Sequence, residues 1–237
     1  MLVAAAACPC PPLLVPEVAA GAAPELDAAR AACTDALGVL AAARPDLLVV
    51  VGPDDGAGTR DYPAGTPGSF RRFGVDLGVR LGEGDGAAGG ELPYGLAVGA
   101  WLLGRTGWAD APVEGRGVGE SLALDACLAE GRRLAGRADR VALLVMGDAS
   151  ACRTLKAPGY LDERAEPYDA EIARALGSAD TDALRALDPG VSRELKVSGR
   201  APWQVLAGAA EGGAALSGVL LHEDAPYGVG YVVAAWS

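Results

Sequence analysis

The sequence predicts an α/β fold in which a central, largely parallel sheet is flanked by helices. Two observations carry this prediction. Residues 2–7, 47–51 and 141–146 are continuous apolar runs, the pattern of strands that are buried on both faces of a parallel sheet. Residues 24–43, between the first two runs, carry apolar side chains at spacings of three and four, which is typical of an amphipathic helix. Together they form a βαβ unit, which we expect to have a right-handed crossover.

The elements after residue 51 follow from the same periodicities and from the turn residues. Residues 52–69 are rich in Gly, Pro and Asp, which predicts a long irregular loop. The glycines of GPDDGAG at 52–58 and GRGVGE at 115–120 are interpreted as turn residues, because neither segment has the G-K-[ST] of a phosphate-binding loop. We expect a glycine-rich turn at 82–90, further strands at 73–81, 217–221 and 229–236, and further helices at 93–103, 120–134, 166–176 and 202–210.

The composition indicates the number of domains and excludes some classes of binding partner. The 237 residues are 51% hydrophobic and 22% charged, and we see neither a repeat nor a linker, so we expect one domain over residues 1–237. The 20 basic and 31 acidic residues give a net charge of -11, which repels nucleic-acid backbones and anionic lipid surfaces. We therefore expect neither nucleic acid nor membrane as a partner.

The cysteines and the first residues predict a cytoplasmic location. There are five cysteines, an odd number, and the segment MLVAAAAC at 1–8 has no basic region and is too short for an export signal. Such a pattern favours reduced thiols. Cys8 and Cys10 are separated by a single proline, which is too close for an unstrained disulfide.

Three predicted strands are followed by loops that start at Cys8, Gly52 and Gly147. The loops at the carboxyl ends of parallel strands are where open α/β sheets bind ligands. We therefore expect a ligand cleft at this edge of the sheet. Its candidate residues in these loops are Cys10, Asp54, Asp148 and Ser150, and Arg200 is expected to reach it from a later loop.

Four segments, taken together and in this order, resemble the class III extradiol ring-cleavage dioxygenase catalytic-subunit (LigB-like) superfamily, including its Memo-like branch. They are CPCPPLLVPE at 8–17, VVVGPDD at 49–55, MGDASACRTLKAPGYLDERAEPYD at 146–169, and SGRAPWQVLAGA at 198–209 with APYGVGYVVAAW at 225–236. The resemblance covers most of the chain and implies a LigB-like fold. It also implies a site built from four positions in these segments.

The four positions depart from the family pattern. In the family the first loop resembles P-H-P-P, the second S-P-H and the third S-G-D-L-S-H, and a carboxylate or, in Memo-like proteins, a cysteine lies near the C-terminus. Carried over, these positions fall on Cys10, Asp54, Ala151 and Ser198. Non-haem Fe(II) oxygenases use two histidines and a carboxylate. Because His222 is the single histidine of the chain, we expect that the iron site is lost and that no cofactor is bound.

Several of these side chains could have either a structural role or a catalytic or ligand-binding role. Cys10 and Asp54 are weak candidates for a remnant zinc site, but a metal-free pocket with an inert, half-buried Cys10 is the preferred interpretation. Ser150 and His222 could belong to a Ser-His-Asp arrangement, yet Asp148 and Ser150 are expected to cap the loop by bonding backbone N–H groups. Cations for an anionic ligand are expected from Arg153, Lys156 and Arg200, whose loops converge on the predicted cleft.

Three functional hypotheses follow. The first is a protein that has lost the iron site and binds a small polar or aromatic molecule in the residual cleft, without redox chemistry. The second is an enzyme that uses Cys10, Asp54 and Asp148 for a metal-free or zinc-assisted hydrolysis or proton transfer. The third is a non-catalytic scaffold or partner subunit, or a homo-oligomer, which predicts an exposed apolar patch around Trp101, Trp108 or Trp236.

Overall fold

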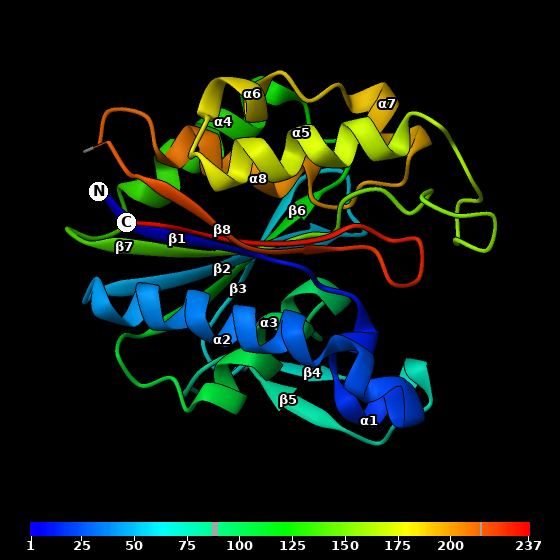
Figure 1. Ribbon diagram of the computed structural model, residues 1–237. Coiled ribbons are helices and arrows are strands. Elements are labelled where there is room, and N and C mark those ends of the chain that lie inside the picture. Colours follow the sequence, from blue (N-terminus) through cyan, green and yellow to red (C-terminus); the bar gives the residue numbers. More distant parts are fainter. Residues whose placement is uncertain (87–89, 214) are drawn as a thin grey trace.

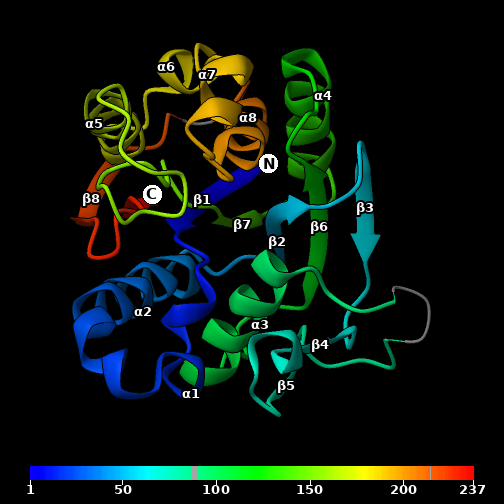
Figure 2. The same cartoon turned by 90° about the vertical axis from the view of Figure 1, so that its right-hand side faces the viewer.

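The computed structural model describes residues 1–86, 90–213 and 215–237, and it confirms the predicted α/β architecture. One sheet of seven strands runs in the order β3-β6-β2-β7-β1-β9-β8. Its parallel centre, seen in Figures 1 and 2, consists of β6 (Val113–Gly119), β2 (Leu47–Asp54), β7 (Val141–Met146) and β1 (Leu2–Cys8). The antiparallel strands β3 (Thr59–Tyr62), β9 (Tyr231–Trp236) and β8 (Gly218–Asp224) complete the sheet on its two sides.

Helices cover both faces of this sheet (Figure 1), and each face has its own apolar core. One face carries α1 (Pro16–Ala19), α2 (Asp27–Ala42), α3 (Tyr94–Thr106) and the hairpin of β4 (Pro67–Ser69) and β5 (Gly78–Arg80). The other face carries α4 (Leu124–Ala135), α5 (Ala165–Gly177), α6 (Thr181–Arg185), α7 (Pro189–Glu194) and α8 (Arg200–Ala209).

The apolar runs formed strands as predicted because the sheet buries them on both faces. All eight residues of β2 and all six of β7 are buried. The register pairs Cys8 of β1 with Met146 of β7, and Val51 of β2 with Val145 of β7. The loops that follow these three strands therefore leave the sheet at the same edge.

Two stretches of backbone differ from the sequence-based predictions. The predicted loop at 52–69 contains the end of β2, all of β3 and β4, and the strand expected at 73–81 shortens to β5 after a turn of 3-10 helix at Arg71–Phe73. The glycines of 115–120 do not form a turn but lie in β6, inside the sheet. Residues 87–89 of the turn predicted at 82–90 lie outside the described residues.

The predicted helices are present with shifted ends. The first helix expected at 24–43 begins as a 3-10 segment, Ala20–Leu26, before α2, and the one expected at 120–134 starts only at Leu124. The short helices α6 and α7 were not predicted. The carboxylates of Asp180 and Asp188 cap them by accepting hydrogen bonds from the N–H groups of Ala183 and Val191.

Glycines set the close packing of α4 on α8. A Cβ added at Gly131 would lie 2.0 Å from the Val205 carbonyl oxygen, whereas one added at Gly38 of α2 would meet nothing within 4 Å. We expect Gly131→Ala to lower the free energy of unfolding by about 2 kcal/mol, since the helices must move apart. The matched change Gly38→Ala is expected to raise it by about 0.5 kcal/mol through helix propensity. Urea unfolding followed by circular dichroism measures both, and equal effects would contradict this account of the packing.

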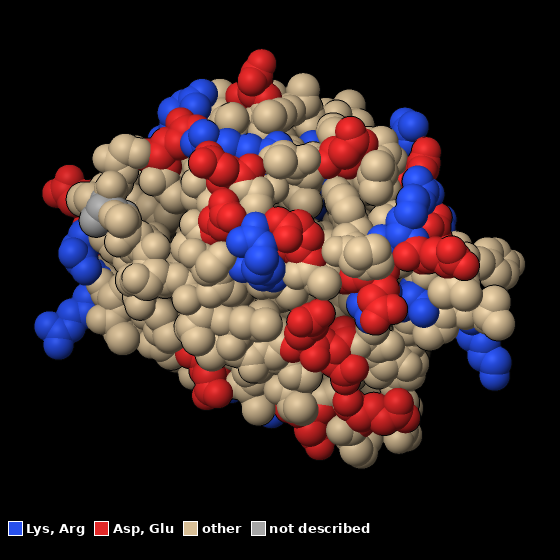
Figure 3. Space-filling view, turned by 45° about the horizontal axis from the view of Figure 1, so that its top comes forward, with Lys and Arg blue, Asp and Glu red and all other residues tan. Residues whose placement is uncertain are grey.

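The surface carries its charges in mixed pairs. Figure 3 shows acidic and basic side chains interspersed over the face turned to the viewer. Arg174, for example, pairs with Glu171 and Asp180. Within the described ranges, no helix is both long and apolar enough to cross a membrane. All five cysteines are free thiols and are buried.

Candidate functional site

A cleft lies where the loops leave the carboxyl ends of the parallel strands. It consists of two adjoining cavities of about 600 and 460 Å³. Both cavities are lined by Glu120, Ser192, Arg193 and Val197, so they lie side by side. This is the edge of the sheet at which the sequence predicted a ligand cleft.

Asp148 lies on the floor of the larger cavity, just after β7. Its carboxylate oxygen Oδ1 accepts a hydrogen bond of 2.8 Å from the backbone N–H of Cys10, and its own N–H donates to Ser198 Oγ at 3.0 Å. The surrounding protein leaves this carboxyl only partly exposed, and burial raises its pKa to about 7. Asp148 can therefore exist in both protonation states near neutral pH.

The structure brings Cys10, Asp148 and Ser198 together, with Tyr94 as a fourth member that the sequence did not indicate. Tyr94 is the first residue of α3, and it lines the larger cavity together with Asp148 and Ser198. The Cys10 side chain is fully buried rather than half-buried, and burial and the neighbouring Asp148 raise the pKa of its thiol. Burial also raises the pKa of Tyr94. Both groups are thus neutral hydrogen-bonding groups at physiological pH.

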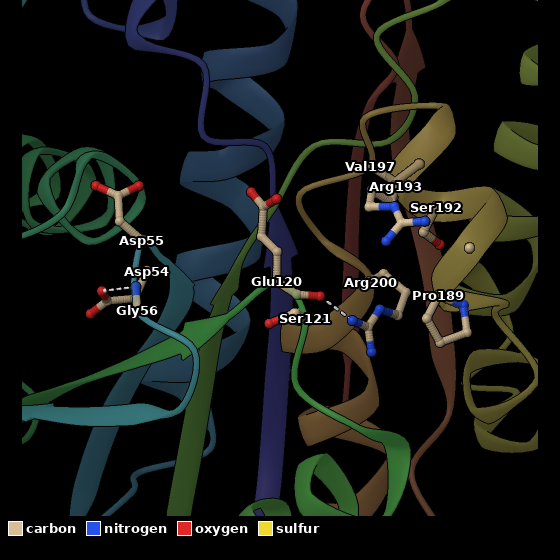
Figure 4. Close-up of a pocket in the computed structure, with 11 residues that line it drawn as sticks. Asp54, Asp55, Gly56, Glu120, Ser121, Pro189, Ser192, Arg193, Val197 and Arg200 are labelled. Carbon is tan, nitrogen blue, oxygen red and sulfur yellow. Dashed lines mark hydrogen bonds between the residues drawn. The ribbon is translucent and has the colours of Figure 1, made fainter.

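Two charged walls face each other across the smaller cavity. Figure 4 shows Asp54 and Asp55, from the end of β2, on one side and Arg193 and Arg200 on the other, with Glu120 between them. Burial and the nearby Asp55 raise the pKa of Glu120. Beyond Arg193, the exposed Lys196 continues the basic wall along the larger cavity.

Asp54 is held away from a shared site with Cys10 by its own hydrogen bonds. Its carboxylate accepts from the Tyr62 hydroxyl at 2.6 Å and from the Gly56 N–H at 3.0 Å. Asp54 lines the smaller cavity, whereas Cys10 lines neither. Over the part of the chain that the structure describes, no three His, Cys, Asp or Glu side chains are arranged to hold a metal ion. Cys10, Asp54, Ala151 and Ser198, the four positions taken from the sequence resemblance, do not fit an Fe(II) centre because they include no histidine.

Ser150 has a structural role that differs from the predicted one. Its hydroxyl and its N–H both donate to the buried carboxylate of Asp169, at 2.8 Å each, so Ser150 is bound to α5 rather than capping its own loop. His222 lies within the edge strand β8 and not at the end of a strand. Ala151 lines the larger cavity but brings no chemistry to it.

The three cations that were expected to bind an anionic ligand make contacts within the protein or lie outside the cleft. Arg200 is buried, and its guanidinium donates to the carbonyl oxygens of Glu120 and Leu122 and to Gln204 Oε1. Arg153 pairs with Asp169 and Glu166, and Lys156 is exposed outside both cavities. Arg193 and Lys196 are the cations that line the cleft with exposed side chains.

Comparison with known proteins supports the fold and leaves the chemistry open. No family model matches the chain, and no curated protein matches it. The crystal structure of an uncharacterized Escherichia coli K12 protein, JW3007, is similar, with a TM-score of 0.63, 16% sequence identity and 99% of each chain covered. At this identity the likeness shows the shared fold alone.

Proposed function

We propose that this protein has the fold of the class III extradiol dioxygenase catalytic subunits without their iron site, and that it binds a small polar or aromatic molecule in the cleft. The proposal rests on the sequence resemblance in four segments and on the residues that stand at the ligand positions, Cys10, Asp54 and Ser198, and at the catalytic-histidine position, Ala151. None of these is a histidine. Iron-dependent ring cleavage needs two imidazoles, which this chain does not have.

The observation that carries the proposal is the composition of the larger cavity. Its floor combines the polar groups of Asp148, Ser198 and Tyr94, and its walls include the prolines at 11 and 12, Val229 and Tyr231. Concave sites with a mainly apolar lining and a few convergent polar groups are typical of small-molecule binding. A ligand hydroxyl or amide would meet Asp148, and an aromatic ring would meet the prolines and tyrosines.

Binding is tested by titrating 15N-labelled protein with the neutral probes phenol and benzamide. We expect chemical-shift changes at the amides of Asp148, Ser198 and Tyr231, and none at Gly38, which lies on α2. Probes that shift no cleft amide, or only distant amides, would contradict binding in the cleft. Elemental analysis of protein purified without chelator is the second test, because a stoichiometric iron atom would overturn the loss of the iron site.

A second candidate function is proton transfer by Asp148. It is favoured by a carboxyl that faces the cleft and whose pKa lies at about 7, where a general acid or base works best at neutral pH. The buried Cys10 and the hydrogen-bonded Asp54, which the sequence placed in the same role, are less suited to it. Proton NMR in D2O would follow exchange of the C–H protons of a panel of small ketones. Exchange that is lost in Asp148→Asn supports catalysis, and its absence from the wild type leaves binding alone.

The scaffold hypothesis loses one of the three tryptophans around which an apolar patch was predicted. Trp236 is buried in the core and donates to the Leu176 carbonyl oxygen, so it belongs to no exposed patch. Trp101 and Trp108 are partly buried. Self-association remains a prediction, to be measured by analytical ultracentrifugation.

A further inference from the structure

The segment that joins α7 to α8 places two cations on the same wall of the cleft. Arg193 lies in α7 and Lys196 follows it, and both line the larger cavity with exposed side chains. Arg193 also lines the smaller cavity, so it stands where the two spaces meet. A ligand in either cavity is within reach of at least one positive charge.

These two cations differ from most arginines of the surface. Arg164 pairs with Asp162 and Glu194, and Arg174 pairs with Glu171 and Asp180. Neither Arg193 nor Lys196 forms an ion pair or a side-chain hydrogen bond with any residue in the described ranges. In a protein with a net charge of -11, two cations without such partners beside one cavity are available to a ligand.

The backbone at Lys196 marks the end of helix α7. Its φ is +58°, in the left-handed region that glycine usually occupies after a helix. The N–H of Lys196 donates to the Arg193 carbonyl oxygen at 3.2 Å and that of Val197 to the Ser192 carbonyl oxygen at 2.8 Å, which is the hydrogen-bond pattern of a Schellman motif. A side chain is strained at this position, yet the position carries a lysine that lines the cavity.

The acidic groups of the cleft leave room for a negative charge at this wall. Asp54 and Asp55 lie across the smaller cavity from Arg193, and Glu120, which lines both cavities, lies between them. Asp148, on the floor of the larger cavity, carries at most part of a negative charge at neutral pH. Beside Arg193 and Lys196 an anion is next to two cations, while Asp54 and Asp55 line only the smaller cavity and burial raises the pKa of Glu120.

We propose that Arg193 and Lys196 form an oxyanion subsite, so that the ligand of this cleft is a small molecule bearing a carboxylate or a phosphate group. This inference rests on the proposed binding function and narrows it to a chemical class. Arginine donates in a planar fork and lysine acts as a point charge, and both geometries suit these two oxyanions. The rest of the ligand extends toward Asp148, Ser198 and Tyr94.

The test compares three aromatic probes, benzamide, its isostere benzoate, and phenyl phosphate, by the same amide titration. We expect benzoate or phenyl phosphate to bind at least tenfold more tightly than benzamide, with shifts at the amides of Arg193, Lys196 and Val197, and more weakly as salt rises. The anion that binds more tightly identifies the source as a carboxylic acid or a phosphate ester. Anions that bind no more tightly than benzamide would overturn the subsite but not the binding cleft, whereas the absence of all cleft shifts would overturn both.

Variants locate the subsite. Lys196→Gly and Arg193→Gln are each expected to weaken anion binding about tenfold and to leave benzamide binding unchanged, and Lys196→Arg is expected to restore most of the affinity. Lys156→Gly is the matched control, because Lys156 is the other lysine of the chain and lies outside both cavities. Wild-type affinity in Lys196→Gly and Arg193→Gln, or an equal loss in Lys156→Gly, would overturn the assignment.

Urea unfolding of the same variants shows whether weaker anion binding comes from the lost charge or from a less stable fold. Glycine relieves the strain at φ +58°, so Lys196→Gly is expected to unfold at the same or a higher urea concentration than the wild type while it binds anions more weakly. Weaker binding together with lower stability would assign the lysine a structural role instead.

Discussion

Replacing Arg200 by methionine is expected to lower the free energy of unfolding by about 3–5 kcal/mol. The guanidinium is only 2% exposed and donates to two carbonyl oxygens, those of Glu120 and Leu122, and to Gln204 Oε1. Methionine fills much of the volume but leaves these three acceptors without a donor. The loop after β6 also loses the side chain that ties it to α8, so we expect the cleft to lose one of its walls.

Urea unfolding of Arg200→Met should be compared with that of Arg164→Met. Arg164 is 53% exposed and pairs with Asp162 and Glu194, and the loss of such surface pairs costs about 1 kcal/mol or less. Arg200→Lys retains the charge but has no planar fork to serve both carbonyls, and it should lie between the wild type and Arg200→Met. If Arg200→Met were no less stable than Arg164→Met, the buried guanidinium would not hold this loop.

The second large effect is expected from Asp148→Asn, and it depends on pH. The pKa of Asp148 is raised from 3.8 to about 7 in the folded protein. Below about pH 4 the carboxyl is protonated in both the folded and the unfolded state, so it makes no pH-dependent contribution. As the pH rises from about 4 to 7 the unfolded state loses this proton while the folded state retains it, and the folded state is destabilised progressively. Above about pH 7 the loss is complete.

Asparagine removes this penalty and retains the acceptor for the Cys10 N–H. A shift of this size corresponds to about 4 kcal/mol at most, and about 3 kcal/mol is expected because water in the cleft reaches the carboxyl. Asp148→Asn should therefore be more stable than the wild type by about 3 kcal/mol at pH 8 and nearly equal to it at pH 4. Urea unfolding at pH 4, 6 and 8 measures the difference. A difference that does not change with pH would show that Asp148 titrates in the fold as it does in the unfolded chain.

The parts of the fold that could be predicted are those in which hydropathy follows burial. The apolar runs of β1, β2 and β7 formed strands because both of their faces lie in apolar cores. Strand β6 was missed because its sequence, VEGRGVG, is buried although it is not a continuous apolar run. Its Arg116 is neutralised by Glu130 and Asp61, and a Cβ at Gly117 would lie 2.3 Å from an Asp54 oxygen. Close approach to another side chain leaves no hydropathy signal in a single sequence.

The residues of the candidate site were likewise predicted only in part. Asp148 was predicted because it follows a buried strand at the expected edge of the sheet, and Ser198 was predicted only from the family resemblance. Arg193 and Lys196 were missed because helix α7 was not predicted, and Tyr94 was missed because it reaches the cleft from the first turn of a helix. Cys10 was expected to matter, if at all, through its thiol, whereas the structure shows that its backbone N–H donates to Asp148. Which group of a residue faces a cavity depends on tertiary packing.

The pairing of β1 determines when this cleft can form during synthesis. Strand β1 lies between β7 and β9, so its neighbours in the sheet are residues 141–146 and 231–236. Once synthesised, β1 therefore waits for more than 130 further residues before it can pair with β7, and such distant contacts slow folding. The hydrogen bond between Cys10 and Asp148 spans the same interval. We expect the ligand cleft to be among the last parts of the protein to form, and a nascent chain that stops before β7 to expose the apolar β1 to chaperones.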